Sequence, residues 1–262
     1  MNIDQKGFSP TYLIVFVLIL GLIGFVGYKV FSTNDENKSD YKTNSGNSSK
    51  VTVSSGKCPD QPVIELPVDQ KRIEAVLYPG QVRGNNFKPH GGFRLYGSNE
   101  AVIKLTADAK IVQGARYIES GEVQYMFDFE TECKIRMRFD HLNTLSPTLQ
   151  AYAEKLPKAE PNNSKTTPLD NSTLKKGTVL ATKVGFIKNN NSSFDFGVYD
   201  MNKLNNASQQ TNWPNDFDHQ NENAKHAVCW LDWLPSSQQS AIKALPGGDG
   251  QQGKASVYCL GN

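Results

Sequence analysis

Residues 134–142 read KIRMRFDHL, and they carry the clearest strand pattern in the chain. Apolar Ile135, Met137 and Phe139 alternate with polar residues, which is the period of a strand with one buried face. Similar short runs, separated by turn residues, recur through the middle of the chain. The candidate strands are residues 101–105, 110–113, 123–130, 134–139, 178–182 and 193–199. The sequence therefore predicts a mainly β domain over residues 58–205.

Residues 206–262 are predicted to form a loop-rich extension packed on that domain. The segment VCWLDWL at 228–234 needs partial burial, so Trp230 and Trp233 are expected in the core rather than in a sugar-stacking surface. The segment PGGDG at 246–250 is a turn signal.

The N-terminal part of the chain predicts a membrane anchor. Residues 8–28, FSPTYLIVFVLILGLIGFVGY, contain no charged residue, and a helix of that length spans about 30 Å, the thickness of a hydrocarbon core. Bulky residues near its end and the lack of an A-x-A site disfavour a cleaved secretory signal. We therefore expect a leader and single-pass helix over residues 1–31. Residues 32–57 are rich in Ser, Asn, Lys and Thr and are predicted to be a flexible linker.

Four cysteines follow the hydrophobic segment, none of them in a C-x-x-C pair, which disfavours a zinc knuckle. An even number of cysteines behind a membrane anchor indicates disulfides in an oxidising compartment. We therefore expect a cytoplasmic N-terminus and an extracytoplasmic C-terminal domain. The sequence does not choose among the three possible connectivities, and buried free thiols are an alternative. Our working hypothesis pairs Cys58 with Cys133 and Cys229 with Cys259.

The charge distribution argues against a nucleic-acid partner. The formal net charge is +2, and no run of Lys and Arg is interleaved with aromatic residues. Asp128, Glu130 and Glu132 fall on one face of a candidate strand, where a solvated surface is favoured over a cation site. The sequence contains no P-loop or Rossmann fingerprint.

The first few residues resemble a type IV prepilin leader, because Lys6, Gly7 and Phe8 stand directly before the apolar segment. In that family a dedicated peptidase cuts after the glycine, and the new N-terminal residue is methylated. The resemblance implies cleavage after Gly7, a mature chain that begins at Phe8, and a role as a minor pilin or pseudopilin with pilus proteins as partners. Tyr12 stands where the family usually has a Glu that helps subunits register in the filament. A plain membrane anchor is the alternative.

A series of short sequence motifs, in the right order, resembles the lysostaphin-type zinc endopeptidases, which cut peptidoglycan and share the duplicated hybrid motif β fold. The motifs are HGGFR at 90–94, LTADAKIV at 105–112, FDHL at 139–142, LKKGTVL at 174–180 and SFDFG at 193–197. The resemblance covers about residues 88–199. It implies a β-barrel or β-sandwich of the lysostaphin type.

In that family, zinc is bound by the His and Asp of the first motif and by the second His of the last motif. Carried over, the ligand positions are His90, Arg94 and Asp195, and the catalytic helper positions are Ser193 and His141. A guanidinium stays protonated and does not ligate a metal. His90 and Asp195 alone fall short of the three protein ligands of a catalytic zinc site. The pattern therefore implies an inactive relative without a cofactor, and a zinc peptidoglycan endopeptidase with an atypical site is the alternative.

Two roles remain open for the altered site. Arg94 and Asp195 could form an ion pair in place of the metal, with His90 hydrogen-bonded beside them. A retained cleft could instead bind a ligand, with Arg94 anchoring an anionic group and His141 making a hydrogen bond. The resulting hypothesis is a membrane-anchored binding or scaffold module of the cell surface. Its candidate ligands are peptidoglycan or another surface glycan or peptide.

Overall fold

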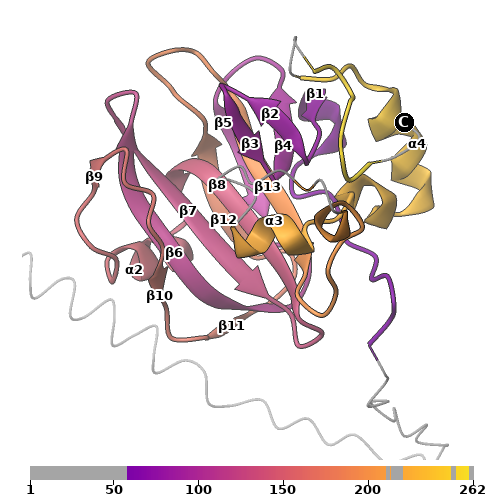
Figure 1. Ribbon diagram of the computed structural model, residues 1–262. Coiled ribbons are helices and arrows are strands. Elements are labelled where there is room, and N and C mark those ends of the chain that lie inside the picture. The colour runs from indigo at the N-terminus through magenta and orange to yellow at the C-terminus, as the bar shows by residue number, and fades with distance from the viewer. Residues whose placement is uncertain (1–57, 211–212, 214–220, 249–251, 260–262) are drawn as a thin grey trace, which may run out of the picture. The chain divides into compact units, whose positions relative to one another are not determined.

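The computed structural model describes residues 58–210, 213, 221–248 and 252–259 (Figure 1). The chain separates into two units, Met1–Ser55 and Gly56–Asn262, and everything described below belongs to the second. The expected membrane helix, the linker and the Gly7–Phe8 cleavage site lie outside the described residues. Within the described ranges, no helix is both long and apolar enough to cross a bilayer.

The described part of the chain is mainly β, as predicted, and most of its strands belong to one large sheet. The first strands are β1 (Ile73–Leu77), β2 (Gln81–Arg83), β3 (Asn86–Lys88), β4 (Gly91–Leu95) and β5 (Glu100–Lys104). The long strands are β6 (Ala109–Glu119), β7 (Glu122–Glu130) and β8 (Ile135–Leu145). The remaining strands are β9 (Glu160–Pro161), β10 (Thr167–Pro168), β11 (Thr173–Leu174), β12 (Val179–Val184) and β13 (Ser193–Asp200).

Short helices connect and flank these strands. They are η1 (Gln70–Arg72), α2 (Pro147–Ala153), η2 (Ala207–Gln209), α3 (Glu222–His226), η4 (Trp230–Trp233) and α4 (Ser236–Ala244). Helix α2 begins where Ser146 caps it: the Ser146 hydroxyl accepts a hydrogen bond from the backbone N–H of Leu149, and Pro147 occupies the first turn.

The main path of the sheet runs β1–β4–β13–β8–β7–β6, with antiparallel neighbours throughout. Strand β13 comes late in the sequence but lies between β4 and β8, so it joins the first and the middle parts of the chain (Figure 1). Strand β12 pairs with both β5 and β8. This order places the residues of three distant sequence segments side by side.

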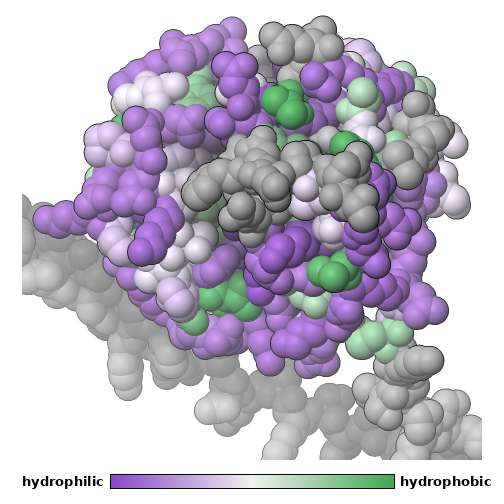
Figure 2. All heavy atoms as spheres, viewed as in Figure 1, coloured by the Kyte–Doolittle hydropathy of each residue, from purple (hydrophilic) through white to green (hydrophobic). Residues whose placement is uncertain are grey.

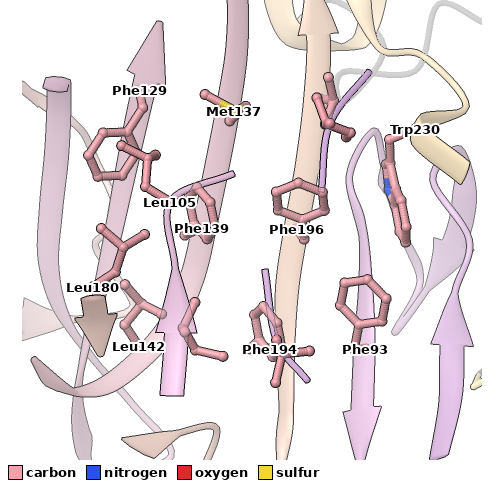
Figure 3. Packing of buried hydrophobic residues seen from close by; sticks show 14 of the residues in the cluster. Phe93, Leu105, Phe129, Met137, Phe139, Leu142, Leu180, Phe194, Phe196 and Trp230 are labelled. Atoms are coloured by element: carbon pink, nitrogen blue, oxygen red, sulfur yellow. The ribbon is translucent and has the colours of Figure 1, made fainter. Parts of the chain in front are cut away.

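The core lies on one face of these strands and is rich in aromatic rings. Phe93 of β4, Phe194 and Phe196 of β13 and Phe139 of β8 are fully buried. Figure 3 shows these rings clustered beside Trp230, whose ring centroid lies 5.0 Å from that of Phe93. The alternation in residues 135–139 is also confirmed, because Ile135, Met137 and Phe139 are all buried.

The extension after residue 206 packs on this core. Trp230 is fully buried and Trp233 nearly so, as expected for the apolar segment around them. The extension also pairs with the edge strand: the Val76 N–H donates to the Pro246 carbonyl, and the Gly248 N–H donates to the Val76 carbonyl. These bonds cover an edge of the sheet that would otherwise expose unpaired backbone groups.

The four cysteines form two disulfides, Cys58–Cys133 and Cys229–Cys259, which is the pairing of our working hypothesis. The second disulfide joins the start of η4 to the end of the described chain. It therefore fixes the extension across the residues that contact β1.

We expect the double substitution Cys229→Ser/Cys259→Ser to lower the free energy of unfolding by about 2–4 kcal/mol, because the disulfide restricts the unfolded chain. Its partners are 30 residues apart in sequence. Urea unfolding of the full chain in detergent measures this loss, with the oxidised wild type as reference. A loss below about 1 kcal/mol would mean that burial of Trp230 and the backbone bonds to Val76 hold the extension without the disulfide.

Candidate functional site

A cleft of about 400 Å³ opens on the face of the sheet opposite the aromatic core. Its polar walls come from β6, β8, β13 and the residue before β4, and they include His90, Tyr117, Arg138, Asp140, His141 and Asp195. Three of these side chains, His90, His141 and Asp195, were predicted as site residues from the sequence.

Asp195 lies at the centre of the site. Its neighbours Phe194 and Phe196 point into the core, so its own side chain points to the opposite face of β13. In the strand register Asp195 stands opposite Asp140 of β8 and Gly92 of β4. A side chain at Gly92 would collide with the Phe194 carbonyl oxygen and lie 2.9 Å from the Asp195 Cα, so glycine leaves the space that Asp195 occupies.

Both imidazoles approach the Asp195 carboxylate. The Asp195 Oδ2 atom lies 2.8 Å from Nε2 of His90 and 3.6 Å from Nε2 of His141. The His90 contact has the distance of an ion pair, but neither ring nitrogen of His90 has a hydrogen bond of good alignment in the described residues. The Arg83 Nη2 atom lies 3.7 Å from the Asp195 Oδ1 atom and also donates to the His90 carbonyl.

A bulge in β8 sets the position of His141. The pairing of β7 with β8 shifts register between Tyr125 and Phe127, and His141 has a φ of +57°, a conformation that costs a non-glycine residue energy. The Asp140 Oδ1 atom accepts hydrogen bonds from the His141 backbone N–H at 2.7 Å and from the Tyr117 hydroxyl at 2.6 Å. The Tyr117 oxygen lies 3.3 Å from Nδ1 of His141. This network holds a strained backbone at the cleft, as functional sites often do.

The surroundings shift the pKa values of the three central groups. Burial alone would raise the pKa of Asp195, but His90, His141 and Arg83 outweigh it and hold this pKa far below its usual range. Burial lowers the pKa of His90 despite the attraction of Asp195. Burial also opposes the charge on His141, but Asp140, Asp195 and Glu119 together raise its pKa. The site therefore favours an ionised Asp195, a neutral His90 and a readily protonated His141.

A buried ion pair supports the cleft from below. Arg138 Nε and Nη2 each donate to one oxygen of Asp128 at 2.8 Å, and Gln113 donates to the same carboxylate at 2.6 Å. Asp128 is fully buried, so our expectation of a solvated face at this residue is wrong. The reason is the hairpin register, which places Asp128 opposite Arg138 and Glu130 opposite Arg136.

Sequence reasoning missed Arg83, Tyr117 and the role of Arg138. The pair Asp128–Arg138 had a usable signal, because acids at 128 and 130 and arginines at 136 and 138 are spaced symmetrically about a tight turn. No sequence pattern indicated Arg83 or Tyr117, because their approach to the site depends on pairings between distant strands.

Arg94 does not reach Asp195, so the expected Arg94–Asp195 ion pair is wrong. The Arg94 Nε atom lies 3.2 Å from the Glu74 Oε2 atom on the neighbouring strand β1, and Nη1 donates to the Gly248 carbonyl. The Arg94 side chain is 42 % exposed and is not part of the cleft wall. Ser193 lies opposite Arg94 in the strand register, two residues before Asp195. The Arg94 guanidinium pairs with a carboxylate near the surface, where desolvating the guanidinium costs less free energy than it would beside the buried Asp195.

The side chains present fit a zinc ion poorly. His90 and Asp195 converge, but the third ligand position of the resemblance, Arg94, is paired elsewhere. Across the described ranges, no group of three or more His, Cys, Asp or Glu side chains is arranged to hold a metal. Arg83 and Arg138 add positive charge near Asp195, and this charge disfavours the binding of a metal cation there.

Comparison with known proteins adds no assignment. No family model matches the chain, and no curated protein is significantly similar to it. The prepilin-like and lysostaphin-like resemblances therefore stay predictions that rest on the residues quoted for them.

The two cleft histidines should titrate on opposite sides of 6.5, with His141 above this value and His90 below it. Because the folded pKa of His141 is raised, its contribution to stability is full below pH 6.5 and is lost as the pH rises through the folded value. Proton–carbon NMR of the full chain in detergent, with His141→Asn and His90→Asn for assignment, measures both midpoints. Asp195→Asn should lower both, because the carboxylate stabilises both imidazolium forms. Midpoints that do not change in Asp195→Asn would contradict the described geometry.

Proposed function

We propose that this chain is a membrane-anchored protein of the cell surface whose β domain binds a cell-wall peptide or glycan in the cleft. The domain is, in this proposal, a catalytically inactive relative of the lysostaphin-type endopeptidases. The observation that carries it is the convergence of His90, His141 and Asp195 on one polar cleft of about 400 Å³. These residues come from three separate sequence segments, and they occupy three of the positions that the resemblance selects.

Binding is favoured over hydrolysis by the chemistry of the side chains. A zinc peptidase needs three ligands and an activated water. Here the position of the third ligand is Arg94, which is paired with Glu74. Ser193 provides a hydroxyl where the family has a second helper imidazole. Asp195 is already engaged by Arg83, His90 and His141, so its carboxylate serves to hold the walls of the cleft together.

The nature of the exposed surface also fits a polar ligand. Figure 2 shows a face on which hydrophilic side chains dominate and hydrophobic ones form small, separate patches. A face of this kind suits a ligand recognised by hydrogen bonds and charge, such as a glycan or a wall peptide.

The proposed location rests on two features. The two disulfides fit an oxidising compartment outside the cytoplasm. The uncharged segment at residues 8–28 fits a single-pass anchor with a cytoplasmic N-terminus. The same segment follows a prepilin-like leader, so a minor pilin or pseudopilin is a second candidate, in which the β domain would be the head of a filament subunit.

Purified full chain in detergent micelles should sediment with isolated peptidoglycan. Asp195→Asn should weaken this binding about tenfold or more, because it removes the charge that holds His90 and His141 in place. Arg94→Gln is the matched control and should bind like the wild type, because Arg94 lies outside the cleft wall. Equal loss in both variants, or no loss in either, would contradict the proposed cleft.

Metal analysis of the same preparation, purified without chelator and then offered zinc, separates binding from hydrolysis. We expect no stoichiometric zinc. One tightly held zinc per chain that is lost in His90→Ala would overturn the inactive-domain proposal in favour of a peptidoglycan endopeptidase.

The pilin candidate makes its own prediction at the N-terminus. Mass spectrometry of the protein from membranes that contain a prepilin peptidase should find a mature chain beginning at Phe8 with a methylated amine, and Gly7→Leu should block the cleavage. An intact N-terminus at Met1 would leave a plain membrane anchor.

A further inference from the structure

Arg138 offers the cleft a rigid hydrogen-bond donor that no described residue uses. Its Nε and Nη2 atoms are both committed to Asp128, whereas its Nη1 atom has no acceptor among the described residues. The Arg138 side chain is only 12 % exposed, and Arg138 is one of the residues that line the cleft. A guanidinium presents its donors in a fixed plane, so the two hydrogen bonds from Nε and Nη2 to Asp128 also fix the direction of the Nη1 group.

The support beneath Arg138 reduces the cost of binding through it. Gln113 donates to Asp128, and Asp128 is fully buried, so the carboxylate that holds Arg138 has no freedom to turn. A donor that is already ordered loses little entropy when a ligand arrives. Asp128 therefore acts as a positioning residue for Arg138.

His90 supplies a second unsatisfied group in the same cleft. Only 9 % of this residue is exposed; its Nε2 atom faces the Asp195 carboxylate at 2.8 Å, whereas its Nδ1 atom has no hydrogen-bond partner within the described ranges. Buried polar groups without partners are rare in folded proteins and are commonly completed by water or a ligand. The site is thus incomplete at two points, one at Arg138 and one at His90.

The charges around the cleft favour an anionic partner. Asp195 and Asp140 are satisfied from within the protein, by Arg83 and His90 for the first and by Tyr117 and the His141 backbone for the second. The wall also carries Lys88 and Lys165 against a single further acid, Glu119. With His141 protonated, the charged groups of the wall and its supports leave one positive charge in excess; they are Arg83, Lys88, Glu119, Asp128, Arg138, Asp140, His141, Lys165 and Asp195.

We propose that the cleft recognises a carboxylate group of its ligand, with Arg138 Nη1 as the principal donor and His141 and Lys88 as supporting cations. A carboxylate matches both the single excess charge and the planar donor. This inference rests on the proposed function and deepens it, because it selects a peptide carboxylate over a neutral glycan as the bound group.

The test uses the full chain in detergent micelles and two small probes, N-acetylalanine and its amide, which differ in the carboxylate alone. Nitrogen-detected NMR of the Arg138 guanidinium and carbon-detected NMR of the His141 ring follow each titration. We expect the acid to shift both signals in a saturable way and to bind about tenfold or more tightly than the amide. The affinity for the acid should fall as the pH rises through the folded pKa of His141, whose charged and polar neighbours are Asp140, Asp195, Glu119, Lys88 and Tyr117.

Variants separate recognition from folding. Arg138→Lys keeps the charge but loses the planar fork, and we expect at least tenfold weaker binding of the acid. Because this change alters a buried pair, Lys88→Ala is the second variant, with an expected loss of about twofold to fivefold at a partly exposed site. Lys183→Ala, which removes a lysine paired with Glu100 outside the cleft wall, is the matched control and should bind like the wild type.

Equal binding of the acid and the amide, or binding of the acid without a shift at Arg138 and His141, would overturn the inference. Failure of the acid to bind at all would also overturn it. These outcomes are distinct from failure of the proposed function, which would appear as peptidoglycan binding that does not depend on Asp195. A cleft that binds peptidoglycan through Asp195 but ignores the carboxylate would keep the first proposal and remove the second.

Discussion

The alternation along strand β13 is the constraint on which the site depends. Phe194 and Phe196 are drawn into the aromatic core, so Asp195 must face the other side of the sheet and become buried there with its charge. A buried carboxylate needs compensation, and the register of β13 between β4 and β8 brings His90 and His141 to it. Hydrophobic burial on one face thus supplies the free energy that holds a polar cluster on the other. Any change that weakens the packing of the two phenylalanines should also disturb the cleft.

The charges of the site form two layers with different tasks. The deeper layer is the pair of Asp128 and Arg138, which gives a fixed direction to one guanidinium group. The upper layer is the cluster around Asp195, in which burial lowers the pKa of His90, whereas Asp140 and Asp195 raise the pKa of His141. The layers meet at Arg138, because it belongs to the buried pair and still lines the cleft.

The sequence predicts the middle strands well because they alternate over several residues, as residues 123–130 and 193–199 do. It misses β1 to β4, since Ile73–Leu77 has no regular alternation and β2 and β3 are three residues long. His90, His141 and Asp195 were selected through a family resemblance, and the structure brings them together. The ion pair of Arg94 with Glu74 could not be predicted, because it depends on the pairing of β4 with β1, which the sequence does not indicate. Arg83 and Tyr117 escaped for the same reason, because strand register joins residues that local patterns leave unrelated.

The disulfide between Cys58 and Cys133 has a mechanical consequence. It closes a covalent loop whose ends are 75 residues apart, and that loop contains β1 to β7. If the chain is tethered at its N-terminus, as proposed, tension from the tether enters the described chain at Cys58 and crosses the sulfur bridge to the turn before β8. The enclosed strands then cannot be drawn out into an extended thread while the bridge is intact, and His90, on the loop, is shielded from the pull. A surface protein pulled between a membrane and a wall polymer would therefore keep the part of its site within this loop folded. The same tension would unfold a domain that lacks the disulfide.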